Sequence, residues 1–74
     1  KEGFGIQFYQ KGDKYEGMWK GDCRHGQGTY WRNEQGKLRR EYTGDWFMDK
    51  KHGRGTYFYK NGDRYDGYWV EGMP

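Results

Sequence analysis

Three side chains could bind a metal ion, and they are Cys23, His25 and His52. Cysteine and histidine are common zinc ligands, but a structural zinc site needs four ligands that lie close together in space. Only these three candidates are present. They belong to two copies of a repeated segment, 23–30 and 50–57, and the stacked units of a repeat protein would hold these copies apart. We therefore expect no metal site and no cofactor, and we expect each histidine to hydrogen-bond at a turn.

Cys23 and His25 also have the residue types of a nucleophile and its base. A nucleophile needs a base within hydrogen-bonding reach and a third group that orients this base. In the second copy of the pattern Lys50 stands where Cys23 stands in the first, so the framework does not depend on a thiol. We expect no catalytic residues and no enzymatic activity.

Two Gly-x-Gly segments, at 26–28 and 53–55, share only two glycines with a phosphate-binding loop. A dinucleotide-binding motif requires a third glycine, a following helix and a βαβ unit, and the sequence provides none of them. The net charge of +3 results from 14 basic and 11 acidic residues that are interspersed. We therefore expect no nucleic-acid partner, because a basic patch or stripe is what nucleic acids require.

The composition of the 74 residues excludes a helical bundle and predicts a core made of aromatic rings. Trp, Tyr and Phe number 4, 8 and 4, whereas Ile, Leu and Val occur once each and Ala is absent. No apolar run approaches the roughly 20 residues that a membrane-spanning helix needs. The single cysteine excludes an internal disulfide, and it favours a cytoplasmic rather than a secreted protein.

The aromatic residues recur at fixed spacing. The pattern Tyr-x-Gly-x-Trp begins at Tyr15, Tyr42 and Tyr65, with spacings of 27 and 23 residues. The pattern His-Gly-x-Gly-Thr-Tyr follows the first two copies, at 25–30 and 52–57. The repeat period is therefore 23 residues, with four additional residues in the connection around 31–40.

This pattern resembles the MORN repeat, whose consensus is Gly-Asp-x-Tyr-x-Gly-x-Trp-x-x-Gly-x-x-His-Gly-x-Gly. The resemblance covers essentially the whole chain, as the second half of a preceding repeat (1–11), a repeat with a longer connection (12–38), a second repeat (39–61) and the first half of a further one (62–74). We expect repeats to continue on both sides. Three residues depart from the pattern: Arg39-Arg40 replace Gly-Asp, and Asp49 stands where the other copies have the turn glycines Gly21 and Gly72. The turns of the second repeat are therefore expected to lack two residues suited to positive φ.

The spacing predicts an all-β fold, an elongated single-layer solenoid of consecutive antiparallel β-hairpins. Tyr15, Gly17 and Trp19 alternate along one face of a strand, and 20–24 provide a turn before a returning strand. Glycine weakens a strand but leaves bare backbone on which an aromatic ring can lie. We predict that the rings of one strand cover the glycines of the next, and that Ile6, Phe8, Trp31 and Phe58 lie on the opposite face.

The chain is expected to act as a non-enzymatic protein-interaction scaffold. A long open sheet offers an aromatic groove in which a helix or extended segment of a partner could bury apolar side chains. The resemblance implies cytoskeletal and ciliary scaffolds, hence a location on the cytoskeleton or in the axoneme of a cilium or flagellum, and self-association through repeats. The residues proposed to contact the partner are Tyr15, Trp19, Tyr30, Tyr42, Trp46, Tyr57, Tyr65 and Trp69.

The basic residues Lys37, Arg39 and Arg40 allow two interpretations. They could be edge charges on a solvated hairpin whose tip lies at 33–36. They could also contact a partner or anionic phospholipid headgroups, which is the alternative function, a membrane-associated module. The acidic residues Asp13 and Asp63 are expected to be turn residues with outward-facing side chains.

Overall fold

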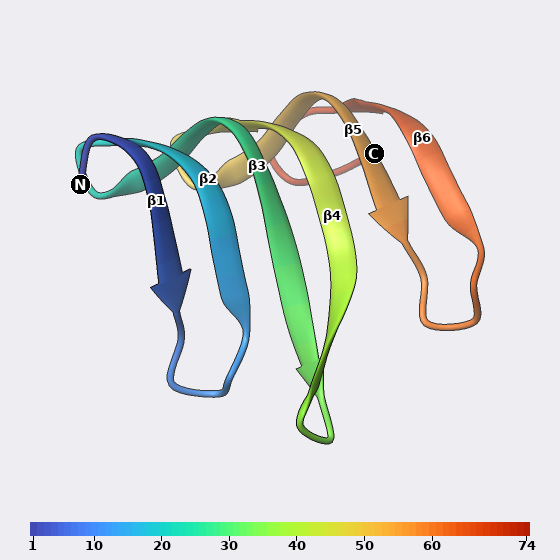
Figure 1. The fold of residues 1–74 in the computed structure, drawn as a ribbon. Helices are drawn as coiled ribbons and strands as arrows, with labels where there is room; N and C mark the ends of the chain where they lie inside the picture. Colours follow the sequence, from blue (N-terminus) through green and yellow to red (C-terminus); the bar gives the residue numbers. More distant parts are fainter.

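The computed structural model describes residues 1–74, which form six β-strands and no helix. The strands are β1 (Gly3–Phe8), β2 (Lys14–Lys20), β3 (Cys23–Glu34), β4 (Lys37–Phe47), β5 (Lys50–Phe58) and β6 (Arg64–Trp69). They form one sheet in the order of the sequence, and every strand is antiparallel to its neighbours (Figure 1). The predicted single layer of consecutive β-hairpins is therefore confirmed.

None of the residues forms a helix that could cross a membrane.

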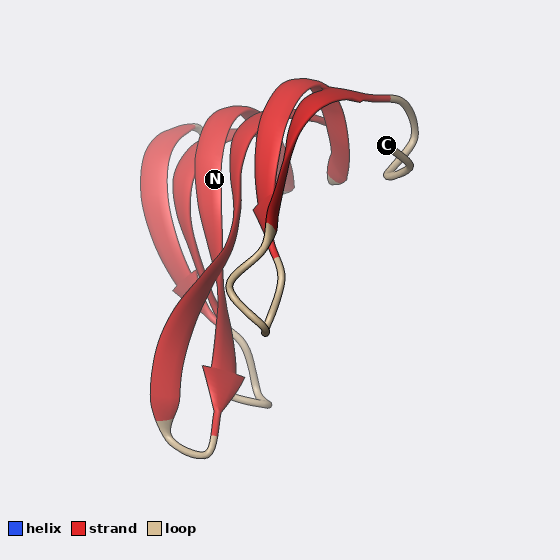
Figure 2. Cartoon of the chain, turned by 90° about the vertical axis from the view of Figure 1, so that its right-hand side faces the viewer, coloured by secondary structure: helices blue, strands red, loops and turns tan.

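The sheet is strongly bent, and all its strands arch in the same direction (Figure 2). The pairing register shifts between Gly17 and Trp19 of β2 and again between Gly44 and Trp46 of β4. Such β-bulges bend a strand, and glycine accepts the altered backbone. The sheet consequently has a concave side, here called the inner face, and a convex outer face.

Five aromatic side chains on the inner face form the core: Tyr15, Trp19, Tyr42, Trp46 and Trp69. Their rings meet edge to face, with Tyr15 between Trp19 and Trp46 at centroid distances of 5.0 and 5.4 Å. Tyr42 lies in the same way between Trp46 and Trp69, at 5.1 and 5.3 Å. Edge-to-face contacts are favourable between aromatic rings. The core is therefore a continuous row of rings, as predicted.

Each tyrosine of this row lies on a glycine of the following strand. A Cβ atom added to Gly28 would overlap the ring of Tyr15, and one added to Gly55 would overlap the ring of Tyr42. Trp46 contacts the same glycine through its Nε1, which donates a hydrogen bond to Gly28 O at 3.1 Å. The prediction that rings cover glycines of neighbouring strands and repeats is confirmed.

The four additional residues lengthen two strands and do not form a loop. β3 has 12 residues and β4 has 11, and the turn between them is confined to Gln35 and Gly36. This hairpin projects beyond its neighbours (Figure 1). The expected four-residue tip at 33–36 is wrong, because Asn33 and Glu34 pair with Leu38 and Lys37.

The turns on the opposite side also correct the predicted alignment. These turns lie at 21–22, 48–49 and 71–72, so Asp49 corresponds to Asp22 and Gly72 and not to Gly21. Met48 and Asp49 both adopt positive φ, at 47° and 71°. Arg39 needs no positive φ, because it lies inside the extended strand β4.

Candidate functional site

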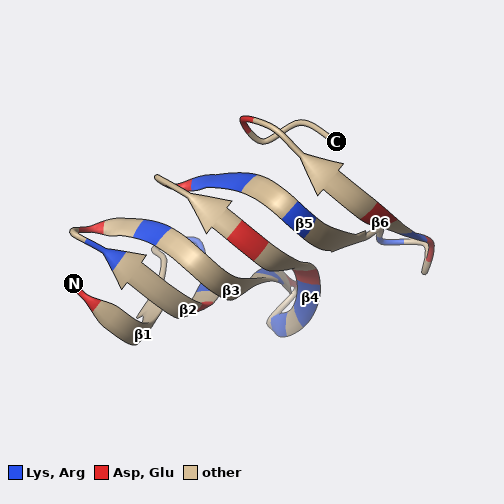
Figure 3. Ribbon diagram, turned by 90° about the horizontal axis from the view of Figure 1, so that it is seen from above, with Lys and Arg blue, Asp and Glu red and all other residues tan.

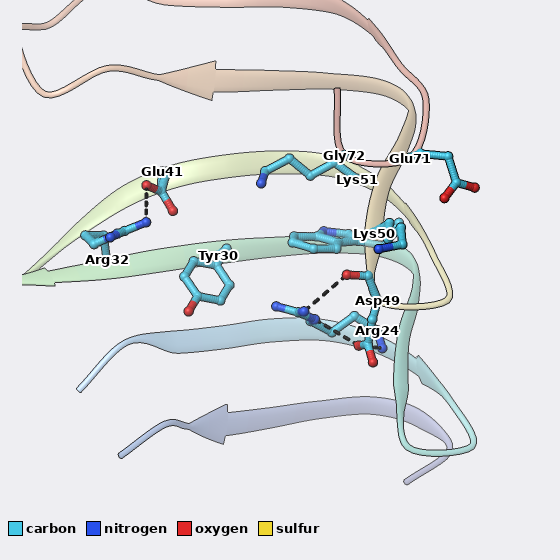
Figure 4. A pocket seen from close by; sticks show the side chains of 10 residues that line it. Arg24, Tyr30, Arg32, Glu41, Asp49, Lys50, Lys51, Glu71 and Gly72 are labelled. Atoms are coloured by element: carbon cyan, nitrogen blue, oxygen red, sulfur yellow. Dashed lines mark hydrogen bonds and ion pairs between the residues drawn. The ribbon is translucent and has the colours of Figure 1, made fainter. Parts of the chain in front are cut away.

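A hollow of about 310 Å³ opens on the inner face, above the row of rings (Figure 4). It lies over strands β3 and β4 and the first residues of β5, beside the turns at 48–49 and 71–72. Charged side chains surround a small aromatic floor. The lining residues are Arg24, Tyr30, Arg32, Glu41, Trp46, Asp49, Lys50, Lys51, Glu71 and Gly72.

Two of the cations, Arg24 and Lys51, occupy the same position in successive repeats, directly before the histidine. The Arg24 guanidinium lies 4.8 Å from the ring centroid of Trp46 and 5.6 Å from that of Tyr30. The Lys51 ammonium lies between 5.7 and 5.9 Å from four ring centroids, which belong to Tyr42, Trp46, Tyr57 and Trp69. Both cations are therefore placed for cation–π attraction and cover the aromatic row.

The two cations differ in their ionic partners. The backbone N–H and the Nε of Arg24 donate to Asp49 Oδ1 at 2.8 and 3.0 Å. Lys51 takes part in none of the ion pairs of the chain. Burial among the rings lowers the pKa of Lys51, although the charge of Glu41 acts in the opposite direction. Of the two cations over the rings, only Lys51 thus lacks an ion-pair partner.

Buried acids accept hydrogen bonds from the tyrosines at the edge of the hollow. Asp13 Oδ2 accepts from the hydroxyl of Tyr30 at 2.7 Å, and Glu41 Oε2 accepts from that of Tyr57 at 3.0 Å. Asp13 is 1% exposed, so the prediction of an outward-facing turn residue is wrong for it. Burial acts to raise the pKa of the Asp13 carboxyl, but hydrogen bonds from the Asn33 N–H and from Tyr30 outweigh burial and lower this pKa.

Glu41 accepts a tyrosine hydrogen bond in the second repeat, as Asp13 does in the first. Asp13 precedes its repeat's tyrosine by two residues and Glu41 by only one. The register shift between Tyr30 and Trp31 in the pairing of β3 with β4 absorbs this difference. Glu41 is also 2.8 Å from Nη2 of Arg32, so its charge is compensated. The sequence signal for such acids was the Gly-Asp that precedes Tyr15, but the second repeat lacks it.

The eight aromatic residues expected to contact a partner fall into two groups. Tyr15, Trp19, Tyr42, Trp46 and Trp69 are at most 8% exposed and form the core. Burial raises the pKa of Tyr15 and of Tyr42 to about 12. Tyr30, Tyr57 and Tyr65 are only partly buried and pack against the core from its edge. A partner on the inner face can therefore contact the row through these three tyrosines and the cations above it.

The structure does not gather Lys37, Arg39 and Arg40 into one basic surface. Arg39 Nη1 donates to Phe58 O at 2.9 Å, and its Nε lies 3.1 Å from Glu34 Oε1 without hydrogen-bond geometry. The Arg40 guanidinium lies 4.5 Å from the ring centroid of Phe58. Lys37 is exposed next to the turn at Gln35 and Gly36. Acidic and basic residues are both spread over the sheet (Figure 3).

Cys23, His25 and His52 do not form a chemical site. No three His, Cys, Asp or Glu side chains are grouped so that they could hold a metal ion. Met48 N–H donates to Nδ1 of His25 at 3.3 Å, and the rings of both histidines pack on Phe47. Desolvation and the carboxylate of Asp49 raise the pKa of the Cys23 thiol, whereas a nucleophilic cysteine needs a lowered pKa.

The outer face is polar in its middle, and its polar side chains bond to one another. The hydroxyls of Thr29 and Thr43 are 2.8 Å apart, Gln27 donates to Asp45, and Thr56 donates to Asp66. Phe4, Ile6 and Phe8 of β1 are exposed. These six polar side chains in the middle of the outer face are therefore already paired with one another.

Comparison with protein families identifies three segments of this architecture. The profile of the MORN repeat matches residues 15–37, 42–64 and 65–74. The chain has no match among the curated proteins. MORN repeats are in general modules that bind proteins or lipids, and the repeat is not itself catalytic. On the evidence of these matches and of its consecutive hairpins, the chain belongs to the MORN repeat family.

Proposed function

We propose that the chain is a non-enzymatic protein-interaction scaffold whose inner face holds a segment of a partner protein. The observation that carries this proposal is the hollow of about 310 Å³, which combines the partly buried ring of Tyr30 with a cation, Lys51, that has no ionic partner. Binding sites combine apolar and aromatic walls with a few polar groups that fix orientation. An extended or helical segment would place apolar side chains on Tyr30 and Tyr57.

The inner face is favoured over the outer face because its polar groups are less completely satisfied. On the outer face the hydroxyls of Thr29 and Thr43 already bond to each other, so a partner gains little by replacing that bond. On the inner face the ammonium of Lys51 lies over aromatic rings and lacks a counterion. A partner group that neutralises this ammonium adds an interaction that the free chain does not make.

The partner in this proposal belongs to a cytoskeletal or axonemal complex, and the location is the cytoplasm, on the cytoskeleton or in a cilium or flagellum. Membership in a family of binding repeats supports an interaction role of this kind. The choice of a cytoskeletal partner follows from the resemblance noted in the sequence.

Photo-cross-linking from neighbouring positions on opposite faces tests the binding surface. A photoreactive phenylalanine analogue replaces Tyr30 on the inner face or Thr29 on the outer face, one residue away. We expect a defined protein to cross-link from position 30 and not from position 29. The purified partner should then bind Lys51→Glu at least tenfold more weakly than the outer-face control Arg54→Glu. Cross-linking from position 29 alone would contradict the proposal.

The second candidate function, binding of anionic phospholipids, has in its favour the exposed Lys37 and Arg40 on the projecting hairpin. Each basic residue near an anionic membrane contributes about 1 kcal/mol. Vesicles of phosphatidylserine and phosphatidylcholine should then pellet the chain at low salt and release it as salt increases, because screening acts over about 10 Å at 0.1 M. Release by Lys37→Glu combined with Arg40→Glu would assign this function.

A further inference from the structure

Arg24 and Lys51 are the centres of two equivalent sites, one in each repeat. Both precede a histidine, both lie over aromatic rings, and both have Trp46 among those rings. The backbone around them is equivalent as well. The N–H of Asp49 donates to Arg24 O at 2.9 Å, and the N–H of Gly72 donates to Lys51 O at 3.0 Å.

Apart from the cation, which is an arginine in the first site and a lysine in the second, the two sites differ in one acidic group. In the first site, Asp49 places a carboxylate against the cation, with Oδ1 bonded to both the N–H and the Nε of Arg24. In the second site, Gly72 occupies the position of Asp49 and has no side chain (Figure 4). Glu71 directly precedes Gly72, but its carboxylate points away from Lys51 in this view. The cation of the second site therefore lacks the carboxylate that Asp49 provides in the first.

We propose that Lys51 binds a carboxylate of the partner segment, an Asp or Glu side chain, in the role that Asp49 performs for Arg24. This inference rests on the proposed function and specifies the chemistry of the partner. The Lys51 N–H lies on the same side of β5 as its carbonyl, so it offers a second donor to the incoming carboxylate. The partner is accordingly an acidic segment.

The charges around the hollow permit an incoming anion. Arg24 pairs with Asp49, and Arg32 pairs with Glu41 at 2.8 Å. Two cations, Lys50 and Lys51, and one acid, Glu71, remain without an ion pair. A carboxylate would bring an acceptor to a region that has surplus donors.

Small probes test the chemistry without the partner. The probe is a capped Ala-Glu-Ala tripeptide, and capped Ala-Gln-Ala is its uncharged match. The indole N–H signals of Trp46 and Trp69 report binding by NMR, because both rings lie next to Lys51. We expect saturable binding of the Glu peptide with a dissociation constant on the order of 1 mM. Lys51→Met, which retains an unbranched side chain over the rings, should weaken binding at least fivefold.

Two substitutions at one position provide the sharpest test. Gly72→Asp should supply the missing carboxylate and compete with the peptide, and Gly72→Asn has nearly the same shape without the charge. Both should fold, because a Cβ at Gly72 meets no atom within 4 Å and Asp49 itself has a φ of 71° at the equivalent position. We expect Gly72→Asp to weaken binding of the Glu peptide at least fivefold and Gly72→Asn to change it less than twofold.

The opposite substitution should create a site. Asp49→Gly removes the carboxylate from Arg24, and we expect the Glu peptide then to bind a second time in the first repeat. Equal binding of the Gln and Glu peptides to the unmodified chain would overturn the proposal. So would Glu-peptide binding unaffected by Gly72→Asp, or tighter binding of inorganic phosphate or phosphatidylserine vesicles that Lys51→Met abolishes.

The scaffold proposal and the carboxylate site can fail separately, and the experiments distinguish the two cases. If no protein cross-links from position 30 but the Glu peptide binds at Lys51, the carboxylate site stands and the scaffold proposal fails. If a partner binds the inner face and the Glu peptide does not bind, only the carboxylate site fails.

Discussion

The two faces of this sheet use adjacent residues for opposite purposes. On the inner face, Gly28 carries the ring of Tyr15, which has no exposed surface. On the outer face, the next residue, Thr29, makes a hydroxyl contact with Thr43 that is partly open to solvent. The comparison teaches that nearly all tertiary stabilisation lies on the inner face. Because the proposed binding site is on the same face, its edge residues can change far more safely than its floor.

The largest expected difference between the faces comes from truncating neighbouring aromatic residues of β4. Trp46 is 5% exposed and contacts both core tyrosines, whereas Phe47 is 52% exposed. We expect Trp46→Ala to lower the free energy of unfolding by about 3 to 5 kcal/mol. Phe47→Ala should cost less than about 1 kcal/mol, because its ring remains largely hydrated in the folded chain. Urea unfolding monitored by circular dichroism compares the two, and equal losses would contradict the one-sided core.

Substitution by alanine at two adjacent positions of β3 should show a smaller difference between the faces. Gly28→Ala places a Cβ into the ring of Tyr15, and the rigid ring must move away from its packed position. We expect a loss of about 2 to 3 kcal/mol. Thr29→Ala removes only a partly buried hydroxyl contact and should cost about 0.5 kcal/mol. A Gly28→Ala variant as stable as the unmodified chain in thermal unfolding would show that the ring does not need bare backbone.

The smallest of the three effects should depend on pH and should also separate the faces. The pKa of Asp13 is lowered on folding, so its ionised carboxylate stabilises the chain above the unfolded pKa of about 3.9. This contribution is lost as the pH falls through the lower pKa of the folded state. We expect Asp13→Asn to cost about 1 to 2 kcal/mol at pH 7 and progressively less as the pH falls below about 3.9, which urea unfolding at a series of pH values measures. Asp66→Asn on the exposed outer face is the control.

Much of the fold could be predicted from the spacing of Tyr15, Gly17 and Trp19, because alternation along a strand decides which residues share a face. The covering of glycines by rings followed from the same pattern. The bend could not be predicted, since it depends on where the pairing register shifts after Gly17 and Gly44. An aromatic groove was predicted from the sequence, but the charged residues that line most of the observed hollow were not.

The candidate site was predicted less well than the fold. The sequence drew attention to the rings, and the structure buries most of them below Arg24 and Lys51. A signal for these cations existed, because a basic residue precedes His-Gly in both copies. The sequence did not show that Glu41 takes the place of Asp13 in the second repeat, and the reason is physical. The two acids reach equivalent hydroxyls from different sequence offsets, and only the observed bulge reveals the equivalence.

The central claim is that tyrosine rings lie directly on bare glycine backbone, and the proton NMR shifts of the glycines test it most directly. A ring that packs on Gly28 and Gly55 shields their Hα protons. Gly36 and Gly62 serve as internal controls, because a Cβ at either position would meet no atom within 4 Å. We predict Hα signals of Gly28 and Gly55 far upfield of the usual glycine range and those of Gly36 and Gly62 within it. Ordinary shifts for all four glycines would contradict the account.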